Sequence, residues 1–103
     1  MSAKSALLQK LNDRSAVIGI VGMGYVGLPL MLRFSEVGYK VLGFDVDAAK
    51  VRALNEGNSY IEHIPAAGIQ RARKAGFRAT ADYAEARSAD ALIICVQIGR
   101  AHV

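Results

Sequence analysis

A glycine pattern at residues 22–27 constrains the fold more than any other feature of this chain. Gly22, Gly24 and Gly27 form a GxGxxG pattern that directly follows the apolar, β-branched run 16–21 (AVIGIV). Three glycines at this spacing are a weak signal alone, but a strand before them and a helix after them make it strong. Gly22 permits a tight turn, Gly24 permits close approach of the backbone to a ligand, and Gly27 lets the helix pack closely on the strand.

The remaining chain alternates between apolar runs typical of buried parallel strands and stretches with helical periodicity. The predicted strands are 16–21, 40–45, 77–80 and 91–96, and the predicted helices are 28–37, 46–55, 65–76 and 82–87. Asp47 is the expected N-cap of the second of these helices. The predicted fold class is therefore α/β, a Rossmann-type doubly wound parallel sheet over residues 15–97 that stops after about its fourth strand.

A short amphipathic helix is expected before this sheet, in segment 1–14. Leu7, Leu8 and Leu11 recur at helical spacing, and Ser5 is its candidate N-cap. We expect the helix to pack on the domain rather than to bind a partner.

Composition and charge argue against several classes of protein. The chain of 103 residues has a net charge of +4, and its one dense basic group is Arg71, Arg73, Lys74 and Arg78. This group has no interleaved aromatic residues for base stacking, so we interpret it as a solvated helix face and expect no nucleic-acid partner. No stretch approaches the ~20 apolar residues of a membrane span, and the N-terminus lacks the apolar centre of a signal peptide. The single cysteine, Cys95, lies in an apolar run, which favours a buried thiol and a cytoplasmic location.

Asp45 gives the glycine pattern its cofactor preference. It ends the second predicted strand at about the ~20-residue offset expected of a dinucleotide-binding fingerprint. Its carboxylate would accept hydrogen bonds from the ribose hydroxyls and repel a 2′-phosphate, so NAD is favoured over NADP. Lys50 and Arg52 lie nearby in the sequence and leave NADP as the alternative cofactor. In the alternative interpretation no ligand binds. The three glycines then only form a tight turn between strand and helix, and Asp45 is only an acidic residue at the end of a strand.

Two stretches resemble the N-terminal domain of the UDP-glucose/GDP-mannose dehydrogenase family. They are GIVGMGYVGLPL at 19–30 and GYKVLGFDVDAAKV at 38–51. The stretches EGNSYIEHI at 56–64 and ADALIICV at 89–96 are most similar to bacterial UDP-N-acetylglucosamine and UDP-N-acetylmannosamine 6-dehydrogenases. The resemblance implies NAD as cofactor, with Asp45 on the ribose and Lys50 near the adenosine end. It also implies a pyrophosphate site on the glycine turn, formed by Gly22, Met23, Gly24, Tyr25, Val26 and Gly27, in which Met23 contributes its backbone alone.

The resemblance further implies the reaction of the parent protein. The family oxidises the 6-hydroxyl of a nucleotide sugar to a carboxylate in two NAD-dependent steps, through a thioester on a catalytic cysteine. Cys95 lies in the wrong place in the family pattern to be that cysteine, so we expect no catalytic residue in this chain and no activity from it alone. The adjacent pair Glu62 and His63 lacks metal-ligand spacing and is not expected to be catalytic or to bind metal. The parent is expected to be a homo-oligomer that takes a UDP sugar for polysaccharide synthesis.

The end of the chain departs from the family pattern. Relatives continue with a Pro-Thr-Pro segment, whereas this chain has Gln97 followed by IGRAHV at 98–103. These six residues match the translation of one reading frame of a widely used sequencing adapter, so we expect 98–103 to be a non-native tail. Genomic DNA that runs continuously through these codons would contradict this expectation.

Two other functions stay open from the sequence. One is another Rossmann dehydrogenase with the same front end, of the 3-hydroxyacid or 6-phosphogluconate type. The other is a non-catalytic module that senses nucleotides or binds nucleic acid, which would show binding without turnover, and salt-sensitive affinity if nucleic acid is the ligand.

Overall fold

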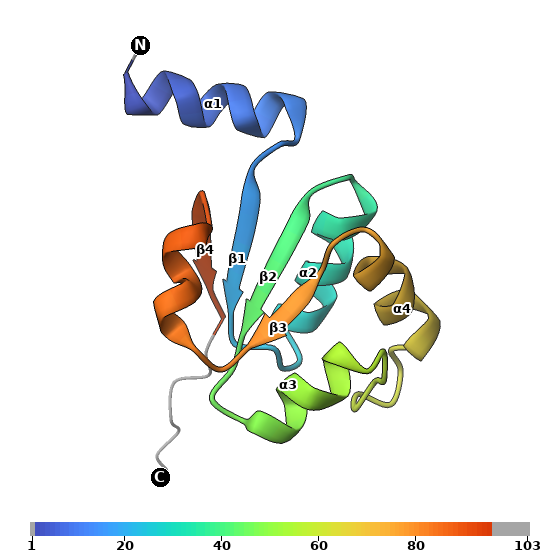
Figure 1. The fold of residues 1–103 in the computed structure, drawn as a ribbon. Coiled ribbons are helices and arrows are strands. Elements are labelled where there is room, and N and C mark those ends of the chain that lie inside the picture. The colour runs from blue at the N-terminus through green and yellow to red at the C-terminus, as the bar shows by residue number, and fades with distance from the viewer. Residues whose placement is uncertain (1, 96–103) are drawn as a thin grey trace, which may run out of the picture.

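The computed structural model describes residues 2–95 and places four parallel strands in one sheet (Figure 1). The strands are β1 (Val17–Val21), β2 (Lys40–Phe44), β3 (Arg78–Thr80) and β4 (Ala91–Ile94), in the order β3-β2-β1-β4. Ile18 of β1 lies in register with Val41 of β2 and Ala91 of β4. The predicted α/β class and parallel sheet are confirmed. Val96 and the segment 97–103, with the expected tail at 98–103, lie outside the described residues.

The helices begin and end close to the predicted positions. They are α1 (Ala3–Asp13), α2 (Gly27–Glu36), α3 (Ala48–Asn55), α4 (Ala66–Lys74) and the 3₁₀ helix η1 (Tyr83–Ser88). Asp47 is the N-cap of α3, as predicted, and its side chain accepts hydrogen bonds from the N–H groups of Ala49 and Lys50.

The predicted N-cap of the first helix was wrong. Ser2 is the N-cap of α1, and its side chain accepts a hydrogen bond from the N–H of Ser5, which lies inside the helix. Ala3 and Lys4 are good helix formers, so the helix extends toward the N-terminus until a hydroxyl is placed to accept a free N–H.

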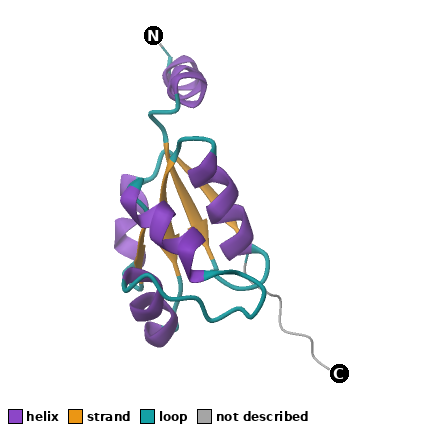
Figure 2. Cartoon of the chain, turned by 90° about the vertical axis from the view of Figure 1, so that its right-hand side faces the viewer, coloured by secondary structure: helices purple, strands orange, loops and turns teal. Residues whose placement is uncertain are grey.

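The main core lies between one face of the sheet and the helices. Ile18, Ile20 and Val41 point to this face, where α2 packs on β1 and β2 and α3 packs beside β3. Figure 2 views the sheet from its side, with helices flanking the strands. On the opposite face, the buried ring of Phe44 stacks on Tyr83 of η1 with 5.7 Å between the ring centroids. The core therefore fixes β1 and β2 most firmly, and these strands carry the glycine turn and Asp45.

The expectation that 91–96 is buried on both faces was wrong for β4. Ala91 and Ile93 are partly buried against the core, but Leu92 is 49% exposed and Ile94 is 69% exposed. Within residues 2–95, β4 lies at the edge of the sheet with β1 as its sole neighbour. Its outward residues share the face of Phe44, where η1 packs and α2, α3 and α4 do not. An apolar run thus predicted a strand correctly, but its burial depends on which elements cover it.

Helix α1 lies beyond the amino end of β1, apart from the other helices (Figure 1). The Lys10 ammonium donates to Asp90 across 3.0 Å, and the Tyr39 hydroxyl donates to the Leu11 carbonyl across 2.6 Å. No residue of α1 is fully buried, although Leu11 packs partly against the core. The helix is therefore held to the domain chiefly by polar contacts near its C-terminal end. None of the helices within residues 2–95 has the length and apolar character required to cross a membrane.

Candidate functional site

A cleft opens at the carboxyl ends of β1 and β4, where the order of the strands reverses. From β1 the chain proceeds to β2 and β3 on one side, and it then crosses to the other side of β1 to form β4. In open α/β sheets, ligands bind at such a switch point. The cleft has a volume of about 560 Å³. It is lined by Gly22, Met23, Gly24, Tyr25, Val26, Asp45, Lys50 and Cys95. Seven of these eight residues belong to the predicted cofactor site, whose remaining member, Gly27, lies at the start of α2.

The three glycines of the turn differ in what surrounds them. Gly22 has a φ of 99°, in the left-handed region that favours glycine. A Cβ on Gly27 would lie 1.7 Å from the Gly22 carbonyl oxygen, so α2 packs on the turn more closely than any side chain allows. A Cβ on Gly24 would meet nothing within 4 Å. Gly22 and Gly27 therefore shape the turn, whereas Gly24 leaves space beside the backbone for a ligand.

The N-terminus of α2 begins beside this space. Val26 is its N-cap and supplies no side-chain hydrogen bond to the first helical N–H groups. The first N–H groups of a helix have no partner within the helix, and together with the helix dipole they attract anions. Tyr25 and Val26 are exposed, and the Met23 side chain is fully buried. The turn therefore offers its backbone to a ligand, and the arrangement fits the pyrophosphate of a dinucleotide.

Asp45 connects the turn to the end of β2. One carboxylate oxygen, Oδ2, accepts a hydrogen bond from the Met23 N–H across 3.0 Å, and Oδ1 accepts from the Asp47 N–H across 2.9 Å. Each carboxylate oxygen has capacity for a further hydrogen bond. Asp45 is partly exposed and lines the cleft, so its carboxylate can accept from a ligand hydroxyl while it holds the turn.

Tyr60 supports the site from the loop 56–64, for which the sequence predicts no role in binding. Its hydroxyl donates a hydrogen bond to the Met23 carbonyl oxygen, and the Lys50 ammonium lies 5.6 Å from the centre of its ring. Burial raises the pKa of the Tyr60 hydroxyl, and the Asp45 and Asp47 carboxylates raise it further, so the phenol keeps its proton and remains a donor. The contact joins residues 37 positions apart, and no local pattern could have revealed it.

The position of Cys95 also differs from the prediction made from the sequence. The thiol was expected to be buried, but Cys95 is partly exposed and lines the cleft beside the glycine turn. Its N–H donates to the Val21 carbonyl across 2.7 Å, which places it level with the end of β1. Because the cleft opens where β1 and β4 end, a residue just after β4 contributes to its wall.

The other residues considered from the sequence lie away from this cleft. Glu62 and His63 are exposed and do not line it. Within residues 2–95, no three His, Cys, Asp or Glu side chains are placed together to hold a metal ion. On α4, Arg71, Arg73 and Lys74 are exposed, and Arg78 on β3 pairs with Glu85 across 2.7 Å.

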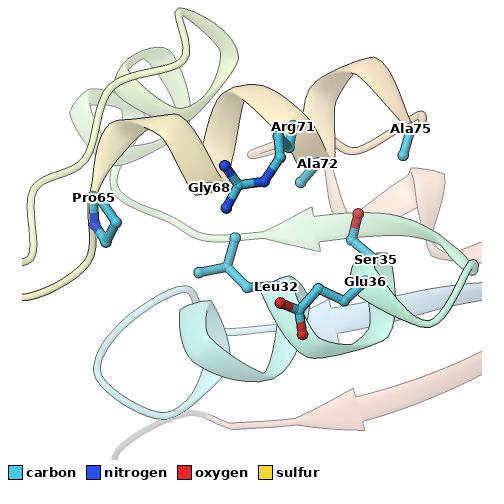
Figure 3. A pocket seen from close by; sticks show the side chains of 8 residues that line it. All are labelled: Leu32, Ser35, Glu36, Pro65, Gly68, Arg71, Ala72 and Ala75. Atoms are coloured by element: carbon cyan, nitrogen blue, oxygen red, sulfur yellow. The ribbon is translucent and has the colours of Figure 1, made fainter.

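A second cleft of about 420 Å³ separates α2 from α4 (Figure 3). Leu32 projects toward Gly68 within it, and Glu36 and Arg71 lie on its opposite sides. Pro65, the N-cap of α4, lies at its edge, but this cleft has no glycine turn and carries the Glu36 carboxylate. The combination of a glycine turn and a helix N-terminus is found at the first cleft.

Comparison with known proteins assigns the same residues to one family. The model of the "UDP-glucose/GDP-mannose dehydrogenase family, NAD binding domain" matches residues 16–99. A UDP-N-acetyl-D-mannosamine dehydrogenase of Pyrococcus horikoshii is 31% identical over 85 residues, which cover 78% of this chain and 20% of the relative. A GDP-mannose 6-dehydrogenase of Pseudomonas putida is 38% identical over 85 residues, covering 77% of this chain and 19% of the relative.

A solved structure agrees with this assignment. The NDP-N-acetyl-D-galactosaminuronic acid dehydrogenase of Methanosarcina mazei matches with a TM-score of 0.74 and 29% identity, over 94% of this chain and 22% of that protein. The chain thus spans about a fifth of the length of the curated relatives it matches.

Proposed function

The chain belongs to the UDP-glucose/GDP-mannose dehydrogenase family, and from this membership we propose that it is the NAD-binding part of an enzyme that oxidises a UDP sugar at its 6-hydroxyl. The observation that carries the proposal is the convergence of the glycine turn, the N-terminus of α2 and Asp45 on one cleft. The pyrophosphate would lie on the backbone of 22–27, the ribose hydroxyls on Asp45, and the adenosine end near Lys50.

NAD is the cofactor of this domain in the family. When bound, it would accept hydride from the sugar. Oxidation of a primary alcohol to a carboxylate removes four electrons, and each NAD accepts two, so the complete enzyme would reduce two NAD per sugar. This chain contributes binding and orientation of the cofactor, and we propose that the catalytic groups lie elsewhere in the parent protein.

The identity of the sugar belongs to the proposal. Relatives at similar identity include enzymes named for UDP-N-acetyl-D-mannosamine and for GDP-mannose. The loop 56–64 favours a UDP-N-acetylhexosamine, with UDP-glucose as the next choice. A cytoplasmic, homo-oligomeric parent without a nucleic-acid or membrane partner completes the proposal.

Calorimetric titration of the 103-residue chain with NAD and with NADP tests the binding function. We expect NAD to bind, and NADP to bind more weakly because its 2′-phosphate would face the Asp45 carboxylate. A folded chain that binds neither would contradict the proposal. For the complete reading frame, the expected result is two NADH formed per UDP sugar consumed, followed by absorbance.

A further inference from the structure

Tyr60 contacts two components of the cleft without lining it. Its hydroxyl donates to the Met23 carbonyl, and its ring lies beneath the Lys50 ammonium at 5.6 Å. It comes from the loop between α3 and α4, outside the glycine pattern. The ring is partly buried and packs against the main core, so the core fixes its position.

The contact with Met23 controls the orientation of one peptide group. The Met23 carbonyl and the Gly24 N–H belong to the same planar trans peptide unit, so they point in opposite directions. A donor that holds the carbonyl also directs the Gly24 N–H away from Tyr60. Because Asp45 binds the Met23 N–H, both main-chain polar groups of Met23 have fixed partners.

The contact with Lys50 controls a charge on the wall of the cleft. A cation over an aromatic face is attracted by the ring quadrupole. Lys50 lines the cleft from the first turn of α3, and Asp45, which directly follows β2, lines the same cleft. Without the ring, the long lysine side chain would be free to turn toward solvent.

We propose that Tyr60 is a positioning residue of the dinucleotide site: its hydroxyl orients the peptide between Met23 and Gly24 toward the pyrophosphate, and its ring holds Lys50 at the cleft. The inference rests on the proposed function, because its ligand is NAD. It assigns part of the positioning of the cofactor to the segment 56–64, which does not line the cleft.

Tyr60→Phe is the test variant, and Tyr39→Phe is its matched control. Each removes one hydroxyl that donates to a main-chain carbonyl, but Tyr39 bonds to Leu11, far from the cleft. We expect Tyr60→Phe to weaken NAD binding about fivefold, and Tyr39→Phe to leave it unchanged. Tyr60→Phe should weaken the binding of adenosine monophosphate, which lacks the pyrophosphate link, much less than it weakens the binding of NAD. Equal losses for both ligands would indicate general damage and would contradict the orienting role.

The part played by the ring is tested by Tyr60→Leu. The loss of NAD affinity in Tyr60→Leu should exceed the loss in Tyr60→Phe by the same factor that Lys50→Met loses alone. In the Tyr60→Leu background, Lys50→Met should cause no further loss of NAD affinity. Additive losses would overturn the role assigned to the ring.

A nuclear magnetic resonance measurement separates this inference from the proposed function. In the free chain, the Gly24 amide resonance should shift in Tyr60→Phe and stay in place in Tyr39→Phe. If the wild-type chain binds NAD and Tyr60→Phe binds it equally well, the inference fails while the function stands. If the wild-type chain does not bind NAD, the function fails, and an unmoved Gly24 resonance would overturn the inference as well.

Discussion

The Asp45 carboxylate accepts a hydrogen bond from the Met23 N–H across 3.0 Å, so the residue that directly follows β2 also fixes the turn that follows β1. A second hydrogen bond, from the Asp47 N–H, directs the chain into α3. One side chain therefore organises two turns at the carboxyl edge of the sheet while it remains available to a ligand in the cleft.

Replacing Asp45 should change both affinity and cofactor choice. We expect Asp45→Ala to weaken NAD binding about tenfold or more, because hydrogen bonds to a charged group contribute about 1.5–3 kcal/mol. Asp45→Asn keeps the shape and removes the charge, so the preference for NAD over NADP should narrow. Calorimetric titration with both cofactors measures these effects. Asp82→Ala is the control, because Asp82 caps η1 through the Ala84 N–H and does not line the cleft. An unchanged preference in Asp45→Asn would count against the ribose role.

Alanine at two motif glycines should separate stability from binding. Gly27→Ala would place a methyl group 1.7 Å from the Gly22 carbonyl, and overpacking of this kind typically costs about 1–3 kcal/mol of unfolding free energy. Gly24→Ala meets no neighbour, so its unfolding free energy should equal or slightly exceed that of the wild type, while NAD binding weakens because the methyl group enters the pyrophosphate space. Urea denaturation and calorimetry measure the two quantities. Gly24→Ala with full NAD affinity would show that the pyrophosphate does not approach this residue.

The thiol of Cys95 should report occupancy of the cleft. Cys95 is the single cysteine of the chain, so iodoacetamide, which alkylates thiols, reports on this site alone. Because it lines the cleft beside the glycine turn, saturating NAD should slow the reaction severalfold. Mass spectrometry measures the rate of alkylation, and the same reaction in urea gives the rate for the unprotected thiol of the unfolded chain. A rate unaffected by bound NAD would place the cofactor away from β4.

Acid should weaken the attachment of α1 and β1 through Asp90. The Val17 N–H donates to this carboxylate across 2.8 Å, and it lowers the pKa of Asp90 together with the Lys10 ammonium at 3.0 Å. A lowered pKa in the folded state means that the contribution to stability is fully present above the unfolded value of about 3.9 and is lost as pH falls through the folded value.

We therefore expect Asp90→Asn to cost about 1 kcal/mol of unfolding free energy at pH 7, and the gap from wild type to close as pH falls below about 4. The other carboxylates that titrate in this range affect both proteins equally, so their contributions cancel in the difference between the two unfolding free energies. A gap that is constant from pH 7 to pH 3 would show that the charge of Asp90 contributes nothing.

Much of the fold was predictable because its signals are local. The apolar run 16–21, the cap at Asp47 and the spacing of the motif glycines each depend on residues within one turn or strand. The cleft was predictable for the same reason, since parallel strands bring their carboxyl ends to one edge and the glycine turn and Asp45 occupy two neighbouring ends.

The features that could not be predicted depend on distant packing. Leu92 and Ile94 belong to an apolar run, but their exposure follows from the position of β4 at the sheet edge within the described residues. Cys95 lines the cleft for the same topological reason. Tyr60 reaches Met23 through the folded core, and nothing in the loop 56–64 alone indicates that contact.

The strand order also determines when the cleft can form during folding. β1 pairs with β2 through nearby sequence, but its pairing with β4 joins Ile18 to Ala91 across most of the chain. Contacts between such distant residues form slowly because the intervening chain must first be ordered. The glycine turn can therefore form early in folding, whereas the wall of the cleft that contains Cys95 forms late. A cofactor that needs both walls would recognise the finished sheet and would raise the population of folded molecules by mass action.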